Sequence, residues 1–245
     1  MGKKSSVEIV IPVYNEEAEL EENVRTLVGF LIQNLDDFLW SVTIVDNAST
    51  DRTWDIAKKL QKIFTSVKAF HLDKKGRGRA VKAAWQKSTA DIRSYMDVDL
   101  SSDLKHFPSL VRSLTRGYDI AIGSRNAPGA RVYGRSILRT LTSKGYICLI
   151  KLLFWTKFTD AQCGFKAVTQ KIAALLLPHV EDNEWFFDSE LLILAEKLGY
   201  RIYEEPVTWN DNPGSTVRVV KTAQGDLKGL LRLFWTRPWK KVSIR

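Results

Sequence analysis

Cysteine is scarce in this sequence, and long apolar runs are absent. The 245 residues include only two cysteines, Cys148 and Cys163, which excludes a disulfide framework or a cysteine-rich zinc site and favours a reducing compartment. No stretch approaches the roughly 18 apolar residues that a transmembrane helix requires. The first apolar run is also too short for a signal peptide. We therefore expect a cytoplasmic protein.

Acidic residues are outnumbered by basic ones. The chain has 37 Lys and Arg against 28 Asp and Glu, a net charge of +9, and the basic residues concentrate in 74–82, 125–157 and 218–241. Such a regional excess predicts an anionic partner: nucleic acid, an anionic membrane or a phosphorylated substrate. No RNP, KH, zinc-finger or basic-zipper pattern is present. We therefore expect no nucleic acid partner.

Apolar runs and helical periodicity alternate along the first half of the chain. Apolar runs predict strands at 7–13, 40–46, 67–72, 92–98 and 118–124, with helices over 16–35, 51–64 and 79–88. This alternation predicts the α/β class, with a mostly parallel sheet flanked by helices. The second half is richer in helix, with predicted helices at about 135–157, 170–177 and 186–198, a strand at 201–205 and a basic amphipathic C-terminus.

Polar residues follow all five strands predicted in the first half. Ligands of parallel α/β sheets bind outside the carboxyl ends of the strands. These ends read PVYNE (12–16), VDNASTD (45–51), KGRGR (75–79), DVD (97–99) and GSR (123–125). Each alone could be a turn or a helix cap, but a sheet that only had to pack would not need polar groups at all five.

Asp97 and Asp99 carry the most specific chemistry. On an extended segment, residues i and i+2 face the same side, and two carboxylates on one side repel unless a cation lies near them. Oxygen ligands suit Mg²⁺ or Mn²⁺, and Mg²⁺ in particular binds through few carboxylates together with substrate phosphates. We therefore expect a metal site at Asp97 and Asp99, with a substrate phosphate beside the basic turn at 75–79.

Several motifs, in this order and spacing, resemble the inverting family 2 glycosyltransferases of the GT-A fold: IPVYNEE, VDNASTDRT, KKGRGRAV, DVDLSSD and GSR. In the second half, RSILRTLTSKGY, DAQCGFKAVT, WFFDSELL and GYRIYEEPVTW resemble polyprenyl-phosphate sugar transferases, dolichyl-phosphate β-glucosyltransferases above all and mannosyltransferases more distantly. The resemblance covers about 7–235. It implies a single GT-A domain in which 1–125 binds the nucleotide sugar and an α-rich half, 126–245, binds the lipid acceptor.

The resemblance also implies residue roles. The implied nucleotide-sugar-binding residues are Pro12, Tyr14, Asn15, Glu16, Val45, Asp46, Asn47, Gly76, Arg77, Asp97, Val98 and Asp99. Asp97 and Asp99 would hold the metal. Three positions depart from the family: Asn47 replaces a frequent Asp, Ser101 a Gln of mannosyl members, and Thr216 a phosphate-clamping Lys, whose charge Arg218 or Lys221 could supply.

The acceptor determines the remaining catalytic residues. A lipid monophosphate is already an anionic nucleophile, so it needs cations more than a general base. The residues at the family's acceptor and catalytic positions are Asp99, Arg125, Arg139, Ser143 and Asp188. Arg135, Arg139 and Lys144 could instead form a solvated helix face. Asp188 and Glu190 are the base candidates for a hydroxyl acceptor, or they could cap the helix that begins near 187.

The predicted function is metal-dependent inverting transfer of glucose from a UDP-sugar to polyprenyl or dolichyl phosphate at the cytoplasmic face of a membrane. Mannosyl transfer from GDP-mannose to the same lipid, and a soluble transferase acting on a sugar hydroxyl, are the alternatives. Residues 147–157 and 227–241 mix Leu, Phe and Trp with Lys and Arg. This pattern predicts peripheral membrane contact, although a buried helix would read similarly.

Overall fold

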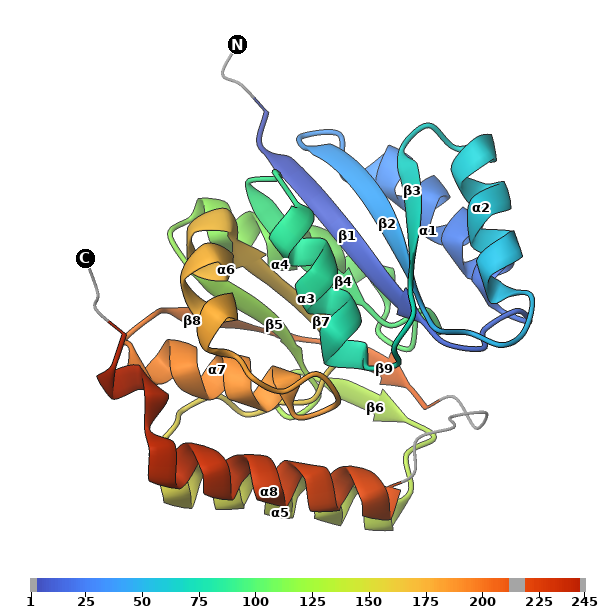
Figure 1. Cartoon of the computed structure of the whole chain (residues 1–245). Coiled ribbons are helices and arrows are strands. Elements are labelled where there is room, and N and C mark those ends of the chain that lie inside the picture. The colour runs from blue at the N-terminus through green and yellow to red at the C-terminus, as the bar shows by residue number, and fades with distance from the viewer. Residues whose placement is uncertain (1–3, 212–218, 243–245) are drawn as a thin grey trace.

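A central sheet of seven strands organises the chain (Figure 1). The computed structural model describes residues 4–211 and 219–242, with the backbone alone at 219–221. The strand order is β3-β2-β1-β4-β7-β5-β8. The strands are β1 (Ser6–Val13), β2 (Leu39–Asn47), β3 (Val67–Leu72), β4 (Ile92–Met96), β5 (Ile120–Ser124), β7 (Phe165–Thr169) and β8 (Ile202–Pro206), and β6 (Arg131–Tyr133) pairs with β9 (Thr208–Asn210) outside this sheet. The predicted mostly parallel sheet is confirmed.

Strand β7 was not predicted, and it is the antiparallel member of the sheet. It lies between β4 and β5 and runs against both of them. Its sequence, FKAVT, places a lysine in the middle of a short apolar run, which hides the strand pattern. Lys166 is fully buried. Its ammonium group donates a hydrogen bond to the Tyr95 hydroxyl and forms an ion pair with Asp188, which makes this burial possible. The C-terminal half therefore contributes β7 and β8 to the same sheet as the N-terminal half.

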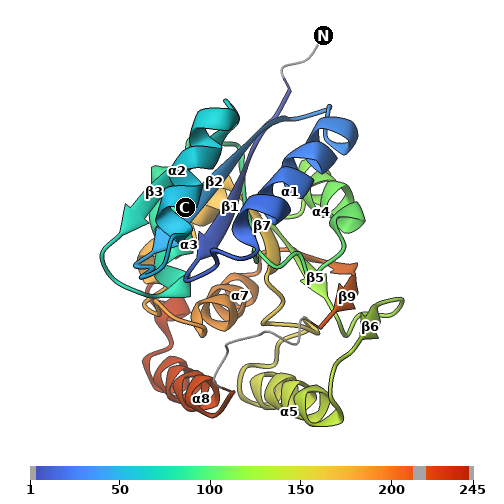
Figure 2. The ribbon, with the colours of Figure 1, turned by 90° about the vertical axis from the view of Figure 1, so that its right-hand side faces the viewer.

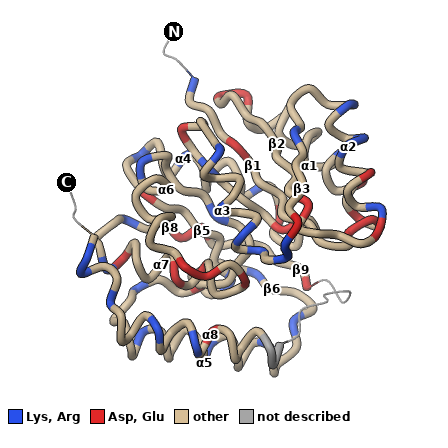
Figure 3. The backbone as a smooth tube through the Cα atoms, in the orientation of Figure 1, with Lys and Arg blue, Asp and Glu red and all other residues tan. Residues whose placement is uncertain are grey.

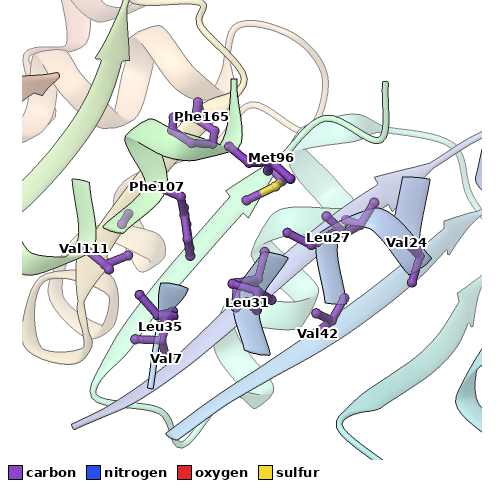
Figure 4. Packing of buried hydrophobic residues seen from close by; sticks show 14 of the residues in the cluster. Val7, Val24, Leu27, Leu31, Leu35, Val42, Met96, Phe107, Val111 and Phe165 are labelled. Atoms are coloured by element: carbon purple, nitrogen blue, oxygen red, sulfur yellow. The ribbon is translucent and has the colours of Figure 1, made fainter. Parts of the chain in front are cut away.

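Helices cover both faces of the sheet. The apolar side chains of α1 (Leu20–Asn34), α2 (Thr53–Ile63) and α4 (Phe107–Thr115) pack into one core cluster, and those of α3 (Arg77–Lys87), α6 (Gln170–Leu176) and α7 (Phe187–Lys197) into another. Helix α4 was not predicted. Figure 4 shows the first cluster, where Leu27 and Leu31 of α1 and Phe107 of α4 lie over β1 and β4. Short 3₁₀ turns complete the chain at η1 (Leu104–His106), η2 (Leu177–His179) and η3 (Pro238–Lys240).

Two long helices, α5 (Ile137–Phe154) and α8 (Val219–Thr236), lie side by side on the outside of the molecule (Figures 1 and 2). Each has one face in the core: Ile150 and Phe154 of α5, and Leu230 and Leu233 of α8, are buried. Each also exposes apolar side chains, namely Ile137, Leu138, Leu141 and Leu152 on α5 and Leu227, Leu231 and Trp235 on α8. The two readings of these segments, buried helix and exposed amphipathic helix, thus apply to opposite faces of the same helices.

A buried ion pair fixes the loop between α5 and β7 to the end of β5. Asp160 is 1% exposed and accepts hydrogen bonds from the Arg125 guanidinium at 2.7 and 2.9 Å and from the Arg125 backbone N–H at 3.1 Å. Its carboxylate also accepts the N–H groups of Gln162 and Cys163. Burial alone would raise the pKa of Asp160, but Arg125 lowers it from 3.8 to about 2. This pair holds the loop that backs the carboxyl end of β4.

Two glycines of α8 provide a matched test of its packing. A Cβ on Gly229 would lie 2.2 Å from the Phe186 ring, whereas nothing lies within 4 Å of a Cβ on Gly225. Gly229→Ala should lower the free energy of unfolding by about 1–3 kcal/mol through overpacking. Gly225→Ala should raise it by about 0.5–1 kcal/mol, because alanine restricts the unfolded chain. Urea unfolding measures both, and equal effects would contradict this packing of α8.

The Arg125–Asp160 pair predicts a pH dependence of stability. The folded pKa of Asp160 is depressed, so its contribution, about 2 kcal/mol, is present above pH ~4 and is lost as the pH falls towards 2. Asp160→Asn should destabilise the protein at pH 7 and leave Arg125 without its carboxylate. By pH 3, roughly half of the linked contribution is gone, so the stability gap between wild type and variant should narrow. Urea unfolding at both pH values measures this gap, and a constant gap would refute the assignment.

Candidate active site

The carboxyl ends of β1, β2 and β4 meet at one edge of the sheet. In the parallel pairing of β1 with β2, Val13 lies opposite Asp46, so Tyr14 and Asn15 emerge beside Asp46 and Asn47. Asn15 and Ala48 adopt left-handed backbone conformations, with φ of 55° and 61°, where the two turns leave the sheet. The sheet therefore brings the expected nucleotide-sugar residues of both strands together.

Two of the expected residues contribute no side chain to this edge. The side chains of Val45 and Val98 pack in the hydrophobic core. The carbonyl oxygen of Val98 accepts a 3.0 Å hydrogen bond from the side-chain amide of Asn23. A substrate could meet these two valines only through backbone groups. Pro12 and Tyr14 are half-buried, and the Lys75 ammonium lies 3.2 Å from the centre of the Tyr14 ring.

Asp97 and Asp99 follow β4, but not on an extended segment. Strand β4 ends at Met96, and 98–99 form a turn in which the N–H of Leu100 approaches the carbonyl of Asp97 at 3.4 Å. The expectation that they share a face of a strand is therefore wrong. They are electrostatic neighbours nonetheless, since burial and then the Asp99 carboxylate raise the pKa of Asp97, against the effect of Arg77. Both oxygens of Asp99 also accept hydrogen bonds from Ser101.

Negative charge accumulates at this edge of the sheet. Burial is the largest cause that raises the pKa of Glu16 to about 7, and the carboxylates of Glu19, Asp99, Asp51 and Asp97 add to it. Among the residues that the structure describes, no three His, Cys, Asp or Glu side chains converge on one point. A divalent cation fits here as a partner of two carboxylates that draws its remaining ligands from substrate phosphate or water.

Arg77 lies between Asp97 and the second half of the chain. Its guanidinium donates to Oδ1 of Asp97 at 2.6 and 3.1 Å and to Oδ2 of Asp188 at 2.6 Å. It also stacks between two rings, 4.9 Å from the centroid of Tyr95 and 5.0 Å from that of Trp185. These contacts fix the position of Asp97 from the side of α3.

Asp188 is buried in an ion network and does not cap its helix. It is 1% exposed, and its oxygens accept from Arg77, Lys166 and the Tyr95 hydroxyl. Burial would raise the pKa of Asp188, but Lys166 and Arg77 hold it below its ordinary value. The N-terminus of α7 is satisfied by another acid: Asp182 accepts the backbone N–H of Phe187 at 3.1 Å.

Glu190, the other base candidate, joins α7 to α8. It is fully buried, and it accepts the backbone N–H of Asp182 at 2.8 Å and the guanidinium of Arg232 at 2.8 Å. Burial raises the pKa of Glu190 above its ordinary value. Each oxygen of Glu190 and of Asp188 already accepts a hydrogen bond within the protein.

Guanidinium groups of the expected acceptor residues and their neighbours gather around Trp209. Arg125 and Arg135 lie 5.4 and 5.8 Å from the Trp209 ring centroid. Arg139 binds both oxygens of Asp211 at 2.6 Å. Burial, and then the charges of Arg125 and Arg139, lower the pKa of Arg135. The carboxylates of Asp160 and Asp211 act in the opposite direction.

The three expected acceptor residues differ in availability. Arg125 is bound by Asp160 and its side chain is only 10% exposed. Its guanidinium therefore stabilises the loop and offers few N–H donors to a ligand. Arg139 is 35% exposed. Ser143 is half-buried one helical turn after Arg139 on α5. Thr216, Arg218 and the side chain of Lys221 lie outside the described residues.

The structure adds residues that the sequence reasoning missed. Asp160, Gly164 and Lys166 come from the DAQCGFK motif, which served there only to indicate the subgroup. A Cβ on Gly164 would lie 1.7 Å from Oδ2 of Asp97, and the Gly164 carbonyl accepts the Asp97 N–H at 3.1 Å. The glycine of the DAQCGFK motif was the sequence feature that could have indicated this contact. The contact itself depends on the antiparallel pairing of β7, which the sequence did not predict.

Gly76, Asn47 and Asp46, three of the expected nucleotide-sugar residues, each have a hydrogen-bond partner in the structure. The backbone N–H of Gly76 donates to Oδ1 of Asn47 at 2.9 Å. A Cβ on Gly76 would lie 2.5 Å from the carbonyl oxygen of Asn183, so only glycine fits. Asp46 is fully buried and lies 2.5 Å from Nδ1 of His71, a residue that the sequence did not single out.

Comparison with solved structures identifies the fold. The chain superposes on glucosyl-3-phosphoglycerate synthase from Mycobacterium tuberculosis in complex with Mn²⁺, UDP-glucose and phosphoglyceric acid, with a TM-score of 0.68 and 15% identity, over 94% of this chain and 80% of that one. The UDP complex of the same enzyme gives a TM-score of 0.68 at 17% identity, over 94% and 80%. The expected GT-A fold is thereby confirmed.

Curated relatives are more similar in sequence. Glycosyltransferase AglD from Haloferax volcanii is 35% identical over 94% of this chain and 37% of its own length. Dolichyl-phosphate beta-glucosyltransferases ALG5C and ALG5A from Trichomonas vaginalis are 29% and 30% identical over 86% of this chain and 65% and 68% of their own lengths. The chain thus spans between about one third and two thirds of the length of these relatives.

A family model agrees with these relatives. The model described as glycosyl transferase family 2 matches residues 8–174, which include most of β1, all of β2 to β4, the acids after β4 and the loop that contacts Asp97. This match covers more than half of the chain. The chain belongs to glycosyl transferase family 2.

Proposed function

We propose that this chain transfers glucose from UDP-glucose, with inversion, to the phosphate of a polyprenyl lipid such as dolichyl phosphate. Relatives named dolichyl-phosphate beta-glucosyltransferase support the acceptor and the sugar. The structural neighbour crystallised with Mn²⁺ and UDP-glucose supports a uridine nucleotide and a divalent metal. Mannosyl transfer from GDP-mannose and transfer to a sugar hydroxyl remain outcomes of the test.

The burial of Asp188 and Glu190 is the observation that carries this proposal. A hydroxyl acceptor needs a general base within hydrogen-bond reach of its proton. Asp188 is engaged by Arg77, Tyr95 and Lys166, and Glu190 by Arg232 and a backbone N–H. A lipid phosphate already carries its negative charge and needs no such base. The engaged carboxylates therefore favour a phosphate acceptor.

The residues after β4 would hold the metal. Asp97 and Asp99 supply the carboxylates for Mg²⁺ or Mn²⁺, and a bound ion would offset the negative charge that develops on the departing diphosphate. Arg77 and Gly164 hold Asp97 from two sides. Tyr14, Glu16, Asp46 and Asn47 would bind the nucleoside. Together they orient the donor at the carboxyl edge of the sheet.

The guanidinium groups near Trp209 would bind the acceptor phosphate. Arg139, with Arg135 beside it, offers guanidinium groups that can bind a phosphate through paired N–H donors. Arg139 now donates to Asp211, and one of these N–H groups would bind the phosphate instead. Ser143 lies one turn further along α5 and adds a hydroxyl donor. In this arrangement Arg125 is a positioning residue that acts through Asp160.

The α5–α8 layer would contact the membrane that carries the lipid. In the described residues, no helix is both long and apolar enough to cross a bilayer. Helices α5 and α8 instead form one outer layer (Figure 2) and expose apolar side chains, and Lys and Arg are distributed along the same helices (Figure 3). This pattern is typical of helices that lie in the interface of an anionic membrane. We propose attachment at the cytoplasmic face.

A donor panel tests the reaction. Purified chain, Mn²⁺ and vesicles containing dolichyl phosphate are incubated with radiolabelled UDP-glucose, UDP-N-acetylglucosamine or GDP-mannose, and the product is extracted into organic solvent. Label should enter the organic phase from UDP-glucose, and EDTA should abolish it. Label that enters from GDP-mannose instead, or that appears only in a water-soluble product, would contradict the proposal.

A charge variant localises the acceptor. Arg139→Gln should lower lipid transfer by at least about tenfold, because a charge-assisted hydrogen bond is worth roughly 1.5–3 kcal/mol. Its affinity for UDP-glucose should stay unchanged. Arg116→Gln, at the C-terminus of α4, is the matched control. Equal losses of transfer and donor affinity in Arg139→Gln would rule out the acceptor role.

Point substitutions test membrane contact without disturbing the core. Truncation of α8 would remove the buried Leu230 and Leu233, so exposed residues are the better choice. Leu138→Ser, Leu231→Ser and Trp235→Ser together should weaken sedimentation with anionic vesicles by at least about tenfold, because each loses apolar burial. High salt should weaken the wild type as well. Ile32→Ser, exposed on α1, is the control, and unchanged binding of the triple variant would refute the contact.

A further inference from the structure

The first half of α8, residues 219–228, buries an acidic side chain. Among the side chains described in this half, Asp226 is the only buried one, and it is 4% exposed. The second half is held by the buried Leu230 and by Arg232, which donates to Glu190 at 2.8 Å. The attachment of the first half therefore depends on the state of one carboxyl group.

The buried carboxyl group of Asp226 is poorly satisfied. Its Oδ2 accepts the side-chain amide of Gln162 at 2.7 Å, and its Oδ1 has no partner within the described part of the chain. An ionised carboxylate offers about four acceptor positions, and burying its charge without hydrogen bonds or a counter-ion is costly. The neutral acid avoids most of this cost, so the surroundings of Asp226 favour the protonated form.

The groups that face Asp226 add to this preference. Burial is the largest cause that raises the pKa of Asp226 from 3.8 to about 7; the Gln162 amide opposes it, and the charges of Asp182 and Asp188 add to it. Tyr146 of α5 also faces this carboxylate. Burial and then the charge of Asp226 raise the pKa of the Tyr146 hydroxyl, which therefore stays neutral. None of these groups is a cation.

Gln162 connects α8 to the loop that lies against Asp97. It belongs to the segment between α5 and β7, and its backbone N–H donates to Asp160 at 3.0 Å. Two residues later, the carbonyl of Gly164 accepts the backbone N–H of Asp97 at 3.1 Å. The first half of α8 is thus attached to the same short loop that supports Asp97.

We propose that a proton on Asp226 controls the docking of the first half of α8: the neutral acid holds this half against the loop of Gln162, and the carboxylate releases it. Once released, this half also loses helical hydrogen bonds, because an isolated helix of a few turns is marginal in water. The second half stays attached through Leu230 and Arg232. The inference does not depend on which sugar or acceptor the protein uses.

The pH range of this release follows from the raised pKa of Asp226. In the docked state Asp226 keeps its proton up to about pH 7, whereas in a released segment it loses the proton near pH 4. Docking is therefore strongest below pH ~4, weakens as the pH rises, and levels off above about pH 7. Between pH 5 and pH 8, the equilibrium constant for release should rise about a hundredfold.

Hydrogen exchange of the wild type at pH 5 and pH 8 tests the inference. The amide groups of 223–228 report release of the first half, and those of 232–236 report the second half. Each rate is divided by that of an unstructured peptide at the same pH. The release constant of the first half should rise about a hundredfold, and that of the second half should stay nearly constant. A first half whose protection does not depend on pH, or two halves that open together, would overturn the inference.

Variants then assign the effect to Asp226. Asp226→Asn keeps an oxygen for the Gln162 amide but cannot ionise, so its first half should stay protected at both pH values. Gln162→Leu removes the hydrogen bond that lowers the pKa of Asp226, so the pH at which release levels off should move upward. Asp36→Asn, exposed between α1 and β2, is the matched control and should behave as the wild type. A pH-dependent release that persists in Asp226→Asn would overturn the inference, because another group would then carry the proton.

Discussion

The guanidinium of Arg77 is the contact on which the site depends. It joins α3 to Asp97 after β4 and to Asp188 on α7, so a single buried cation connects three elements from both halves of the chain. Lys166 on β7 provides the second positive charge next to Asp188. Removal of one member would leave an uncompensated buried charge, which typically costs about 3–5 kcal/mol. Asp97, one of the two acids that would bind a metal, is thus positioned by the same network that holds the halves together.

Much of the fold was predictable because apolar runs and strand ends are local features. The strands β1, β2, β3, β5 and β8 lie close to their predicted positions, and so do α1, α2 and α5. The antiparallel β7 was missed because Lys166 breaks its apolar pattern, and a lysine is compatible with a buried strand only if acceptors surround it. The turn after β4 was missed because it depends on the contact of Asp97 with Gly164.

The partners of the site residues could not be predicted from the sequence. Motif spacing brought Asp46, Asp97 and Arg77 to one edge of the sheet, as the structure has them. It gave no indication that Arg125 is bound by Asp160, 35 positions away, or that Asp188 is enclosed by Tyr95 and Lys166. Such pairings depend on which strand lies beside which, and that order is not encoded in any short motif.

The position of β7 has a consequence for how the chain is made. Strand β5 reaches the rest of the sheet through β7, which is synthesised about 45 residues later. On a ribosome that adds about 5–20 residues each second, the first four strands wait for seconds before the central gap in the sheet is filled. During this interval the open edge of β4 exposes unpaired backbone groups. A fragment that ends near residue 125 would keep that edge open permanently, so the N-terminal half should be produced only together with the half that follows it.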